Sequence, residues 1–350
     1  MRRLTNFIEV HRSGSHCGST MVRTVLNGWG LPYSEDLCFG LGSGLGFVYR
    51  KYEETGSYFF TGRSDSLLEN VAQALGARLE YGRTDNPDAG WQQVKQMIDA
   101  GIPVVLDLDR MYLPFLVERN KLDRPYHFGL HNAILVGYDE SKDEIYLLDY
   151  LWNEVQVVSF AQLRAARNSQ DGPVRPENAW KTLIPPAQER EIGLAIHEAI
   201  RRNCHRMREP FGFKVGLPGL KPFAKEVRRW RTVQSEAVRM ENAYMAFVLF
   251  ERVGTGGGNF RRIYARFLAE AAKRTGNPAL EQGAQLYMDL FRRWREIARL
   301  FEEGASDPNA GIFAPDPAVD SLLEELVFLE HQGMAILETA LPVGKEGARC

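Results

Sequence analysis

The chain has 350 residues, of which 44% are hydrophobic and 25% are charged, so it can bury a large core and its length predicts two domains. Its formal net charge of −2 argues against a general nucleic-acid binder, and no apolar stretch reaches the length of a membrane span. The four cysteines have neither metal-ligand nor disulfide spacing, which predicts a reducing compartment and no metal site: Cys17, Cys38, Cys204 and Cys350.

Residues 1–9 contain two arginines and a short, interrupted apolar run, which predicts no signal peptide and therefore a cytoplasmic protein. The next element is a helix over 17–28 that starts at Cys17. A thiol at a helix N-terminus meets unpaired N–H groups and the positive end of the helix dipole, which stabilise the reactive thiolate. Cys17 is therefore a candidate nucleophile, although a single cysteine is more often a small buried hydrophobic residue.

The chain up to residue 186 mixes helices with short apolar strands, a pattern typical of an α+β domain. We predict helices over 65–76 and 89–100, and strands over 77–82, 102–109, 132–138, 145–150 and 180–184. The glycine cluster at 40–46 lacks the spacing of a dinucleotide fingerprint and follows a helical stretch, so it predicts a tight loop near the cysteine helix.

His131 opens a buried strand, and a turn at 139–143 leads into a second strand that ends near Asp149. A hairpin of these strands returns Asp149 to the neighbourhood of His131. Cys17, His131 and Asp149 then have the types and order of a nucleophile, a base and the carboxylate that orients it. A structural His and a capping Asp are the alternative interpretation.

Asp107 and Asp109 end the strand over 102–109, near the base of the expected cleft. Asp109 with Tyr112 is a candidate site for the ammonium group of an amine, and structural capping is the equal alternative. His127 is the rival to His131 as base, but it lies in a polar loop with no strand to fix it.

From residue 188 onward, helical periodicity dominates, with helices predicted over 188–207, 220–251, 259–275, 279–303 and 317–340. The glycine-rich segment 254–258 precedes Arg261 and Arg262 at a helix start. Exposed N–H groups beside arginines suit a phosphate, whereas a flexible interhelical connection is the plainer alternative. The sequence thus predicts a catalytic domain over 1–187 and an all-α accessory domain over 188–350.

Several segments resemble one known family: His16-Cys17, residues 34–45, 103–109 with 112–114, and His131 through Tyr138-Asp139 to Asp149. They are similar to the papain-like fold of bacteriocin-processing cysteine peptidases, and more closely to the N-terminal domain of the butirosin biosynthesis acyltransferase family. Residues from about 188, notably 254–268, resemble the helical domain of unknown function that follows that domain.

The resemblance implies an enzyme that moves an acyl group from a carrier-protein thioester to an amine, with Cys17 as nucleophile, His131 as base and Asp149 as its orienter. Papain-like peptidases carry a Gln before the cysteine as an oxyanion donor, whereas this chain has His11 six residues before Cys17. The candidates for that role are the backbone N–H of Cys17 and the side chains of His11 and His16.

We therefore expect a cysteine-dependent, amide-forming acyltransferase of specialised metabolism. Its expected partners are an acyl carrier protein or another acyl thioester, a small amine acceptor, and a second copy of the chain in a homodimer. Arg261 and Arg262 are the residues expected to contact the acyl donor. No cofactor is expected, since phosphopantetheine enters only as part of the donor. Hydrolysis by a peptidase or amidase, and a non-catalytic binding scaffold, remain the alternatives.

Overall fold

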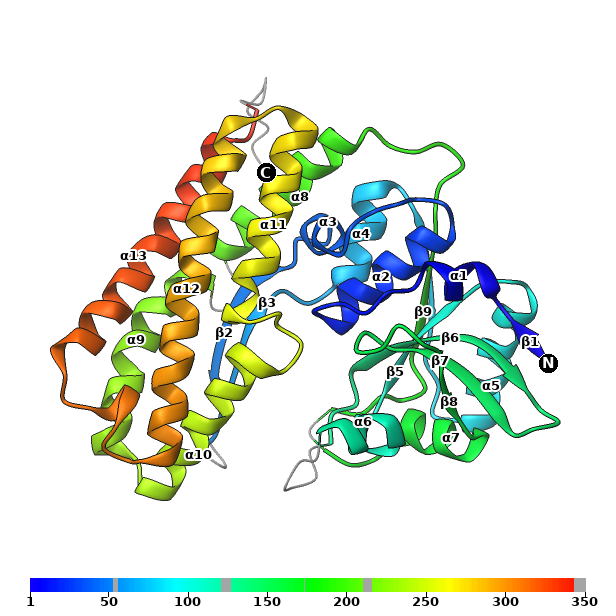
Figure 1. Ribbon diagram of the computed structural model, residues 1–350, viewed down its shortest axis with the longest axis horizontal. Coiled ribbons are helices and arrows are strands. Elements are labelled where there is room, and N and C mark those ends of the chain that lie inside the picture. The colour runs from blue at the N-terminus through cyan, green and yellow to red at the C-terminus, as the bar shows by residue number, and fades with distance from the viewer. Residues whose placement is uncertain (53–55, 121–126, 173, 210–215, 343–350) are drawn as a thin grey trace. The chain divides into compact units, whose positions relative to one another are not determined.

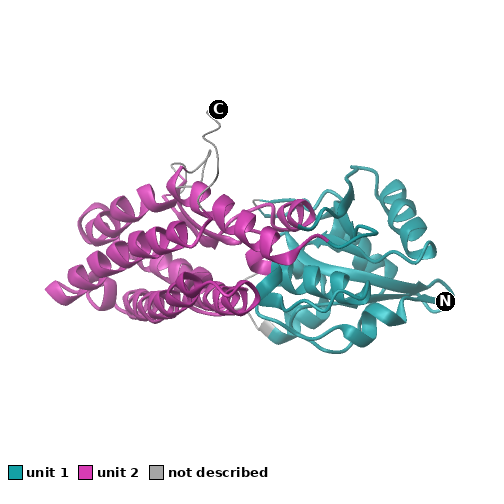
Figure 2. Cartoon of the chain, turned by 90° about the horizontal axis from the view of Figure 1, so that it is seen from above, with its two compact units in different colours: residues 1–38, 75–189 teal, residues 39–74, 190–350 magenta. Residues whose placement is uncertain are grey.

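The computed structural model describes residues 1–52, 56–120, 127–172, 174–209 and 216–342. The chain divides into two compact units (Figure 2). The first unit comprises Met1–Cys38 and Leu75–Glu189, and the second comprises Phe39–Ala74 and Arg190–Cys350. The contiguous division predicted from the sequence differs from this in one segment, because residues 39–74 belong with the helices of the second unit.

The first unit is built on an antiparallel sheet with the strand order β4-β9-β5-β6-β7-β8, in which β1 also pairs with β6 (Figure 1). The strands are β1 (Arg2–Arg3), β4 (Arg78–Gly82), β5 (Val104–Leu108), β6 (His131–Asp139), β7 (Glu144–Leu148), β8 (Gln156–Val158) and β9 (Trp180–Ile184). Strands β5, β6 and β7 are almost continuously apolar and buried, so they form the core of this unit. The five strands predicted in this region are confirmed.

Helices cover this sheet, with α2 above it and α7 below it in the view of Figure 1. The helices are α1 (Thr5–Val10), α2 (Cys17–Gly28), α5 (Pro87–Asp99), the short 3-10 helix η1 (Arg110–Tyr112), α6 (Pro114–Asn120) and α7 (Phe160–Asn168), while α3 (Glu35–Leu41) crosses the unit boundary. Helix α2 packs against β6 and β9 through a buried stripe that includes Met21, Val25 and Leu26. Ser159 and Gln162 form a capping box that starts α7.

The second unit contains a hairpin that the sequence analysis missed, formed by β2 (Leu45–Lys51) and β3 (Tyr58–Arg63). Alternate residues of β3 are buried, and Tyr58 and Phe60 contact the aromatic side chains of Phe223 and Trp230. This aromatic packing explains why a strand pair from the first fifth of the chain belongs with distant helices. The glycine cluster at 40–46 overlaps the start of β2, and its composition predicts a loop there, not a strand.

The regular elements of the second unit described after the hairpin are all helices: α4 (Leu67–Leu75), α8 (Ile192–Arg208), α9 (Gly216–Val233), α10 (Glu236–Phe247), η2 (Val248–Arg252), η3 (Gly258–Phe260), α11 (Arg261–Thr275), α12 (Pro278–Ser306), η4 (Gly311–Phe313) and α13 (Pro317–Thr339). The helix predicted over 220–251 is two helices, because Ser235 caps the start of α10 by accepting a hydrogen bond from the N–H of Val238. Taken as a whole the chain is α+β, as predicted. Among the helices described, none is long and apolar enough to cross a membrane.

Candidate active site

The predicted base and its orienter meet at one end of the sheet. His131 is the first residue of β6, and Asp149 directly follows β7, which pairs with β6 in antiparallel register. The Nε2 atom of His131 lies 2.5 Å from the Oδ2 atom of Asp149. Asp149 is fully buried and His131 is 7% exposed, so water does not compete for this contact. The hairpin predicted from the sequence therefore brings these two side chains together.

The hydrogen bonds of Asp149 define the tautomer of His131. The Oδ1 atom of Asp149 accepts a hydrogen bond from the N–H of Leu151 at 3.0 Å, which leaves Oδ2 to accept from the imidazole. Nε2 of His131 therefore carries a proton, and Nδ1 of the neutral ring carries the lone pair. An imidazole held in this way accepts a proton at Nδ1, which is the role of a general base.

Cys17 is the first residue of α2, and its side chain is half-buried. The segment before it is tied to the chain just after β7. The N–H of Gly14 donates to the carbonyl of Tyr150 at 2.7 Å, and the N–H of Ser13 donates to Oδ1 of Asn153 at 2.8 Å. Because α2 itself packs on β6, its N-terminus is held at the end of the sheet that carries His131.

Tyr150 directly follows Asp149 and lies beside the His131 ring. Its ring centroid lies 5.9 Å from that of His131. Burial raises the pKa of the Tyr150 phenol, and the charge of Cys17 raises it further because two negative groups oppose each other. Tyr150 thus lies beside the predicted base, and the charge of the predicted nucleophile influences its phenol.

His11 supports this arrangement from inside the fold. Its Nε2 donates to the carbonyls of Asp149 at 3.1 Å and Trp152 at 3.0 Å, and its Nδ1 lies 2.9 Å from Oγ1 of Thr24. Burial lowers the pKa of His11, and the two carbonyl acceptors only partly oppose that shift. Both ring nitrogens are engaged, so His11 acts as a neutral tie between α2 and Asp149 and has no N–H left for an oxyanion.

His16 is the N-cap residue of α2 and is 5% exposed. Its Nδ1 accepts a hydrogen bond from the N–H of Ser19 at 3.2 Å. A ring nitrogen that accepts a hydrogen bond carries no proton, so the neutral His16 ring is protonated at Nε2. The ring nitrogen that carries the proton in His16 is therefore Nε2, and His16 directly precedes Cys17.

Glu35 is a residue of this site that sequence analysis did not identify. Its buried carboxylate accepts hydrogen bonds from the N–H groups of Ser15 and His16 at 2.9–3.0 Å and from the hydroxyls of Ser19 and Thr20, both at 3.0 Å. It therefore holds the loop before Cys17 and the first turn of α2. Residues 34–45 carry a family resemblance, but nothing local in the sequence indicates this contact of Glu35.

A second histidine–carboxylate pair lies where β5 ends. Oδ2 of the fully buried Asp109 accepts from Nδ1 of His127 at 2.7 Å and from the hydroxyl of Ser169 at 2.5 Å. Burial opposes ionisation of Asp109, but the hydrogen bonds from Ser169 and His127 outweigh it, so the pKa of Asp109 is lowered. The hydroxyl of Tyr112 donates to Oδ2 of Asp171 at 2.7 Å. His127 is therefore fixed by a carboxylate, contrary to the expectation of an unsupported loop histidine.

Asp109, His127 and Asp171 are also the group of described residues whose atoms could ligate a cation, since these atoms lie within 4.8 Å of one another. The same atoms take part in the hydrogen bonds to Ser169 and Tyr112. A cation would therefore compete with these hydrogen bonds for the same atoms.

The two arginines predicted to contact a carrier have different environments. Arg261 does not lie on the surface; it is fully buried, and its Nε donates to Oε1 of Glu330 at 2.7 Å. Arg262 is half-buried, with its guanidinium 5.7 Å from the ring centroid of Phe291. The N–H of Gly258, which a phosphate would need, donates to Glu251 at 2.9 Å. The prediction that Arg261 contacts a phosphate or a carrier is therefore wrong, because the charge of Arg261 is already paired with Glu330 inside the second unit.

Two family models match the chain. The model for butirosin biosynthesis protein H, N-terminal, matches residues 16–150, a range that contains Cys17, His131 and Asp149. The model for a domain of unknown function (DUF4872) matches residues 161–337, about half of the chain. A comparison with curated proteins gives no match. The chain therefore belongs to the family in which the N-terminal domain of butirosin biosynthesis protein H is followed by a DUF4872 domain.

Proposed function

We propose that the protein is a cysteine-dependent acyltransferase that forms an amide bond by moving an acyl group from a thioester to an amine. The observation that carries this proposal is the buried contact between His131 and Asp149, beside the sheet end to which the start of α2 is tied. The matched family is named for butirosin biosynthesis, which supports a role in the biosynthesis of a specialised metabolite. A thioester donor carries its own activation, so the transfer needs no ATP.

In the first step, Nδ1 of His131 takes the proton of the Cys17 thiol, and the thiolate attacks the thioester carbonyl. The carbon–sulfur bond to the donor breaks, and the donor thiol leaves with the proton from the imidazolium. This step conserves the thioester energy in acyl-Cys17. In the second step the amine attacks the acyl group, the bond to Cys17 breaks, and the amine proton passes through His131 to the departing thiolate.

The negative oxygen of each tetrahedral intermediate needs hydrogen-bond donors. We propose the backbone N–H of Cys17 as one donor and the side chain of His16, the residue directly before it, as the candidate for the second. Glu35 fixes the loop that carries both donors.

We place the amine acceptor near Tyr112 and Asp171, where half of the Asp171 side chain is exposed, and its nitrogen attacks acyl-Cys17 as the neutral amine. Asp109 is buried beneath His127 and would act on the acceptor only through that histidine. An acyl carrier protein is the proposed donor, and Arg262 is the arginine of the predicted pair that a carrier can reach.

The test is to incubate the purified protein with a panel of carrier-bound and small acyl thioesters, followed by peptide mass spectrometry. The proposal expects an acyl mass increase on the peptide that contains Cys17 and its loss when an amine is added. Cys204 is an internal control, because burial raises its pKa to about 12 and keeps it unreactive.

Cys17→Ala is expected to abolish both acylation and turnover while the protein stays folded. Rapid loss of acyl-Cys17 to water in the presence of amines would instead indicate a hydrolase. Absence of any adduct, together with full activity of Cys17→Ala, would refute a covalent mechanism.

A further inference from the structure

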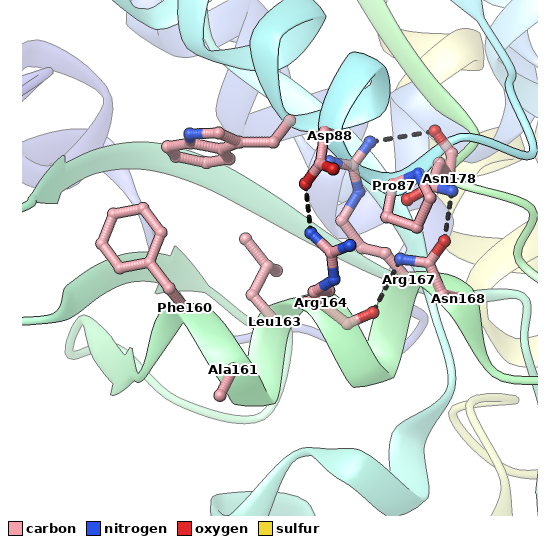
Figure 3. A pocket seen from close by; sticks show the side chains of 10 residues that line it. Pro87, Asp88, Phe160, Ala161, Leu163, Arg164, Arg167, Asn168 and Asn178 are labelled. Atoms are coloured by element: carbon pink, nitrogen blue, oxygen red, sulfur yellow. Dashed lines mark hydrogen bonds and ion pairs between the residues drawn. The ribbon is translucent and has the colours of Figure 1, made fainter.

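A pocket outside the Cys17 site lies in the first unit, between α5 and α7, with a cavity of about 180 Å³ (Figure 3). One wall is apolar, and its aromatic rings of Trp91 and Phe160 meet edge to face with centroids 5.0 Å apart. The other wall is polar. The pocket is lined by Pro87, Asp88, Trp91, Phe160, Ala161, Leu163, Arg164, Arg167, Asn168 and Asn178.

Arg167 is the unusual member of the polar wall. It is 2% exposed, and its terminal nitrogens donate to the carbonyls of Gly90 at 3.1 Å and Asn178 at 2.9 Å. Its Nε is buried and has no hydrogen-bond partner among the described residues. Burial lowers the pKa of Arg167 to about 10, so the group is still a cation at neutral pH.

No carboxylate of the described residues forms an ion pair with Arg167. The nearby carboxylate of Asp88 already forms an ion pair with Arg164, so it does not neutralise Arg167. The contrast with Arg261 is informative, because that equally buried guanidinium has Glu330 as its partner. Since a buried charge is costly without a counter-charge, the wall of this pocket carries one uncompensated positive charge.

Asn178 adds an acceptor to the same wall. Its Nδ2 donates to the carbonyl of Thr84 at 2.9 Å and to Oδ1 of Asn168 at 2.5 Å, which fixes the orientation of its amide. The opposite atom, Oδ1, is buried and has no hydrogen-bond donor in the described part of the chain. Buried groups of this kind are normally satisfied by water or by a ligand.

We propose that this pocket binds a small organic acid with a hydroxyl or amino group next to its carboxylate and an apolar side chain. The carboxylate would neutralise Arg167 and accept from its Nε–H. The neighbouring hydroxyl or amino group would donate to Oδ1 of Asn178, and the apolar chain would contact Trp91, Phe160 and Leu163. The proposal is independent of acyl transfer at Cys17.

The experiment is isothermal titration of the full chain with 2-hydroxy-4-methylpentanoate, with leucine, and with 2-hydroxy-4-methylpentanamide. The amide has the same shape as the hydroxy acid but no charge. At least one of the two acids is expected to bind. The amide is expected to bind at least about tenfold more weakly, because it loses the charge-assisted hydrogen bond. If neither acid binds, or if the amide binds as well as the hydroxy acid, the proposal is wrong and water fills the pocket.

Three variants locate the binding. Arg167→Gln removes the charge, and Ala161→Trp places a bulky ring at an exposed residue of the lining while leaving Arg167 in place. Both are expected to abolish binding. Arg78→Gln is the charge-matched control on an exposed part of β4 and is expected to bind normally. If Arg167→Gln does not fold, Ala161→Trp alone decides, and acid binding that persists in it overturns the proposal.

Discussion

Two histidines of the first unit each contact a buried aspartate, and their environments distinguish their roles. The side chain of His131 is 9% exposed and lies beside Tyr150, whose carbonyl accepts a hydrogen bond from Gly14 in the loop before Cys17. The side chain of His127 is 28% exposed and lies beside Tyr112. A base that activates a thiol must reach that thiol, so proximity to Cys17 matters more than the presence of an aspartate.

We therefore expect His131→Ala to slow acylation of Cys17 by roughly 10²–10⁴-fold, the usual contribution of a general base. Asp149→Asn should cost somewhat less, because the carboxylate sets the tautomer and does not carry the proton. His127→Ala is the matched control and should leave acylation nearly unchanged. Stopped-flow acylation rates test this order, and a larger loss for His127→Ala would reverse the assignment.

The lowered pKa of His11 predicts that the free energy of unfolding depends on pH. This pKa is lowered from 6.5 in the folded chain, so the unfolded chain binds a proton more readily as the pH falls. The free energy of unfolding should therefore be maximal above pH 6.5 and decrease below it, by at most about 1.4 kcal/mol per pH unit from this group. Thermal unfolding between pH 7.5 and 5 should show a flatter profile for His11→Gln. An unchanged slope would exclude His11 as the source.

At the scale of elements, the start of α2 depends on a carboxylate from α3. The Glu35 carboxylate accepts hydrogen bonds from four donors of the segment 15–20. The loop before Cys17 lies so close to Glu35 that a Cβ added at Gly14 would come within 2.6 Å of the carboxylate. The helix N-terminus that carries Cys17 is thus positioned by packing and hydrogen bonding, not by helix propensity alone.

Glu35→Gln should lower the free energy of unfolding by on the order of 1–3 kcal/mol, because the amide replaces one acceptor oxygen with a donor facing N–H groups. It should also slow acylation, since the loop before Cys17 loses its anchor. Glu140→Gln is the control, because Glu140 forms an exposed pair with Lys95 that contributes less than about 1 kcal/mol. Urea unfolding and acylation rates together test this, and equal effects of both variants would contradict the anchoring role.

At the scale of the whole molecule, each unit has its own core. The second unit has the buried pair of Arg261 and Glu330 at its centre, where Oε1 of Glu330 also accepts from Nε1 of Trp294 at 2.7 Å. Arg261 donates further to the carbonyls of Gly46 and Gly62, which tie the hairpin to the helices. Arg261, which the sequence suggested as a contact for a carrier protein, instead stabilises the second unit.

Glu330→Gln should therefore destabilise the second unit by about 3–5 kcal/mol, because it leaves the charge of Arg261 buried without a partner. The double variant Arg261→Met with Glu330→Leu should recover part of that loss. Glu325→Gln is the control, because Glu325 lies on the same helix as Glu330 but forms an exposed pair with Arg293 of α12. Scanning calorimetry measures these changes, and a double variant less stable than Glu330→Gln would contradict the argument.

The sequence by itself determined the features that depend on local pattern. The period of apolar residues gave the α+β class, the strands of the first unit and the start of α2 at Cys17, and the turn at 139–143 brought Asp149 back to His131. These are interactions between neighbouring elements, for which periodicity and turn chemistry carry the information.

Only the tertiary structure decided the interactions between residues far apart in the chain. The hairpin of β2 and β3 joined the helical unit because its aromatic face needs helices that come more than 150 residues later, such as that of Phe223. Glu35, Arg167 and Arg261 look like ordinary surface charges in the sequence, and each is buried in the fold. Whether a charged residue is buried depends on what packs around it, and no local pattern encodes that.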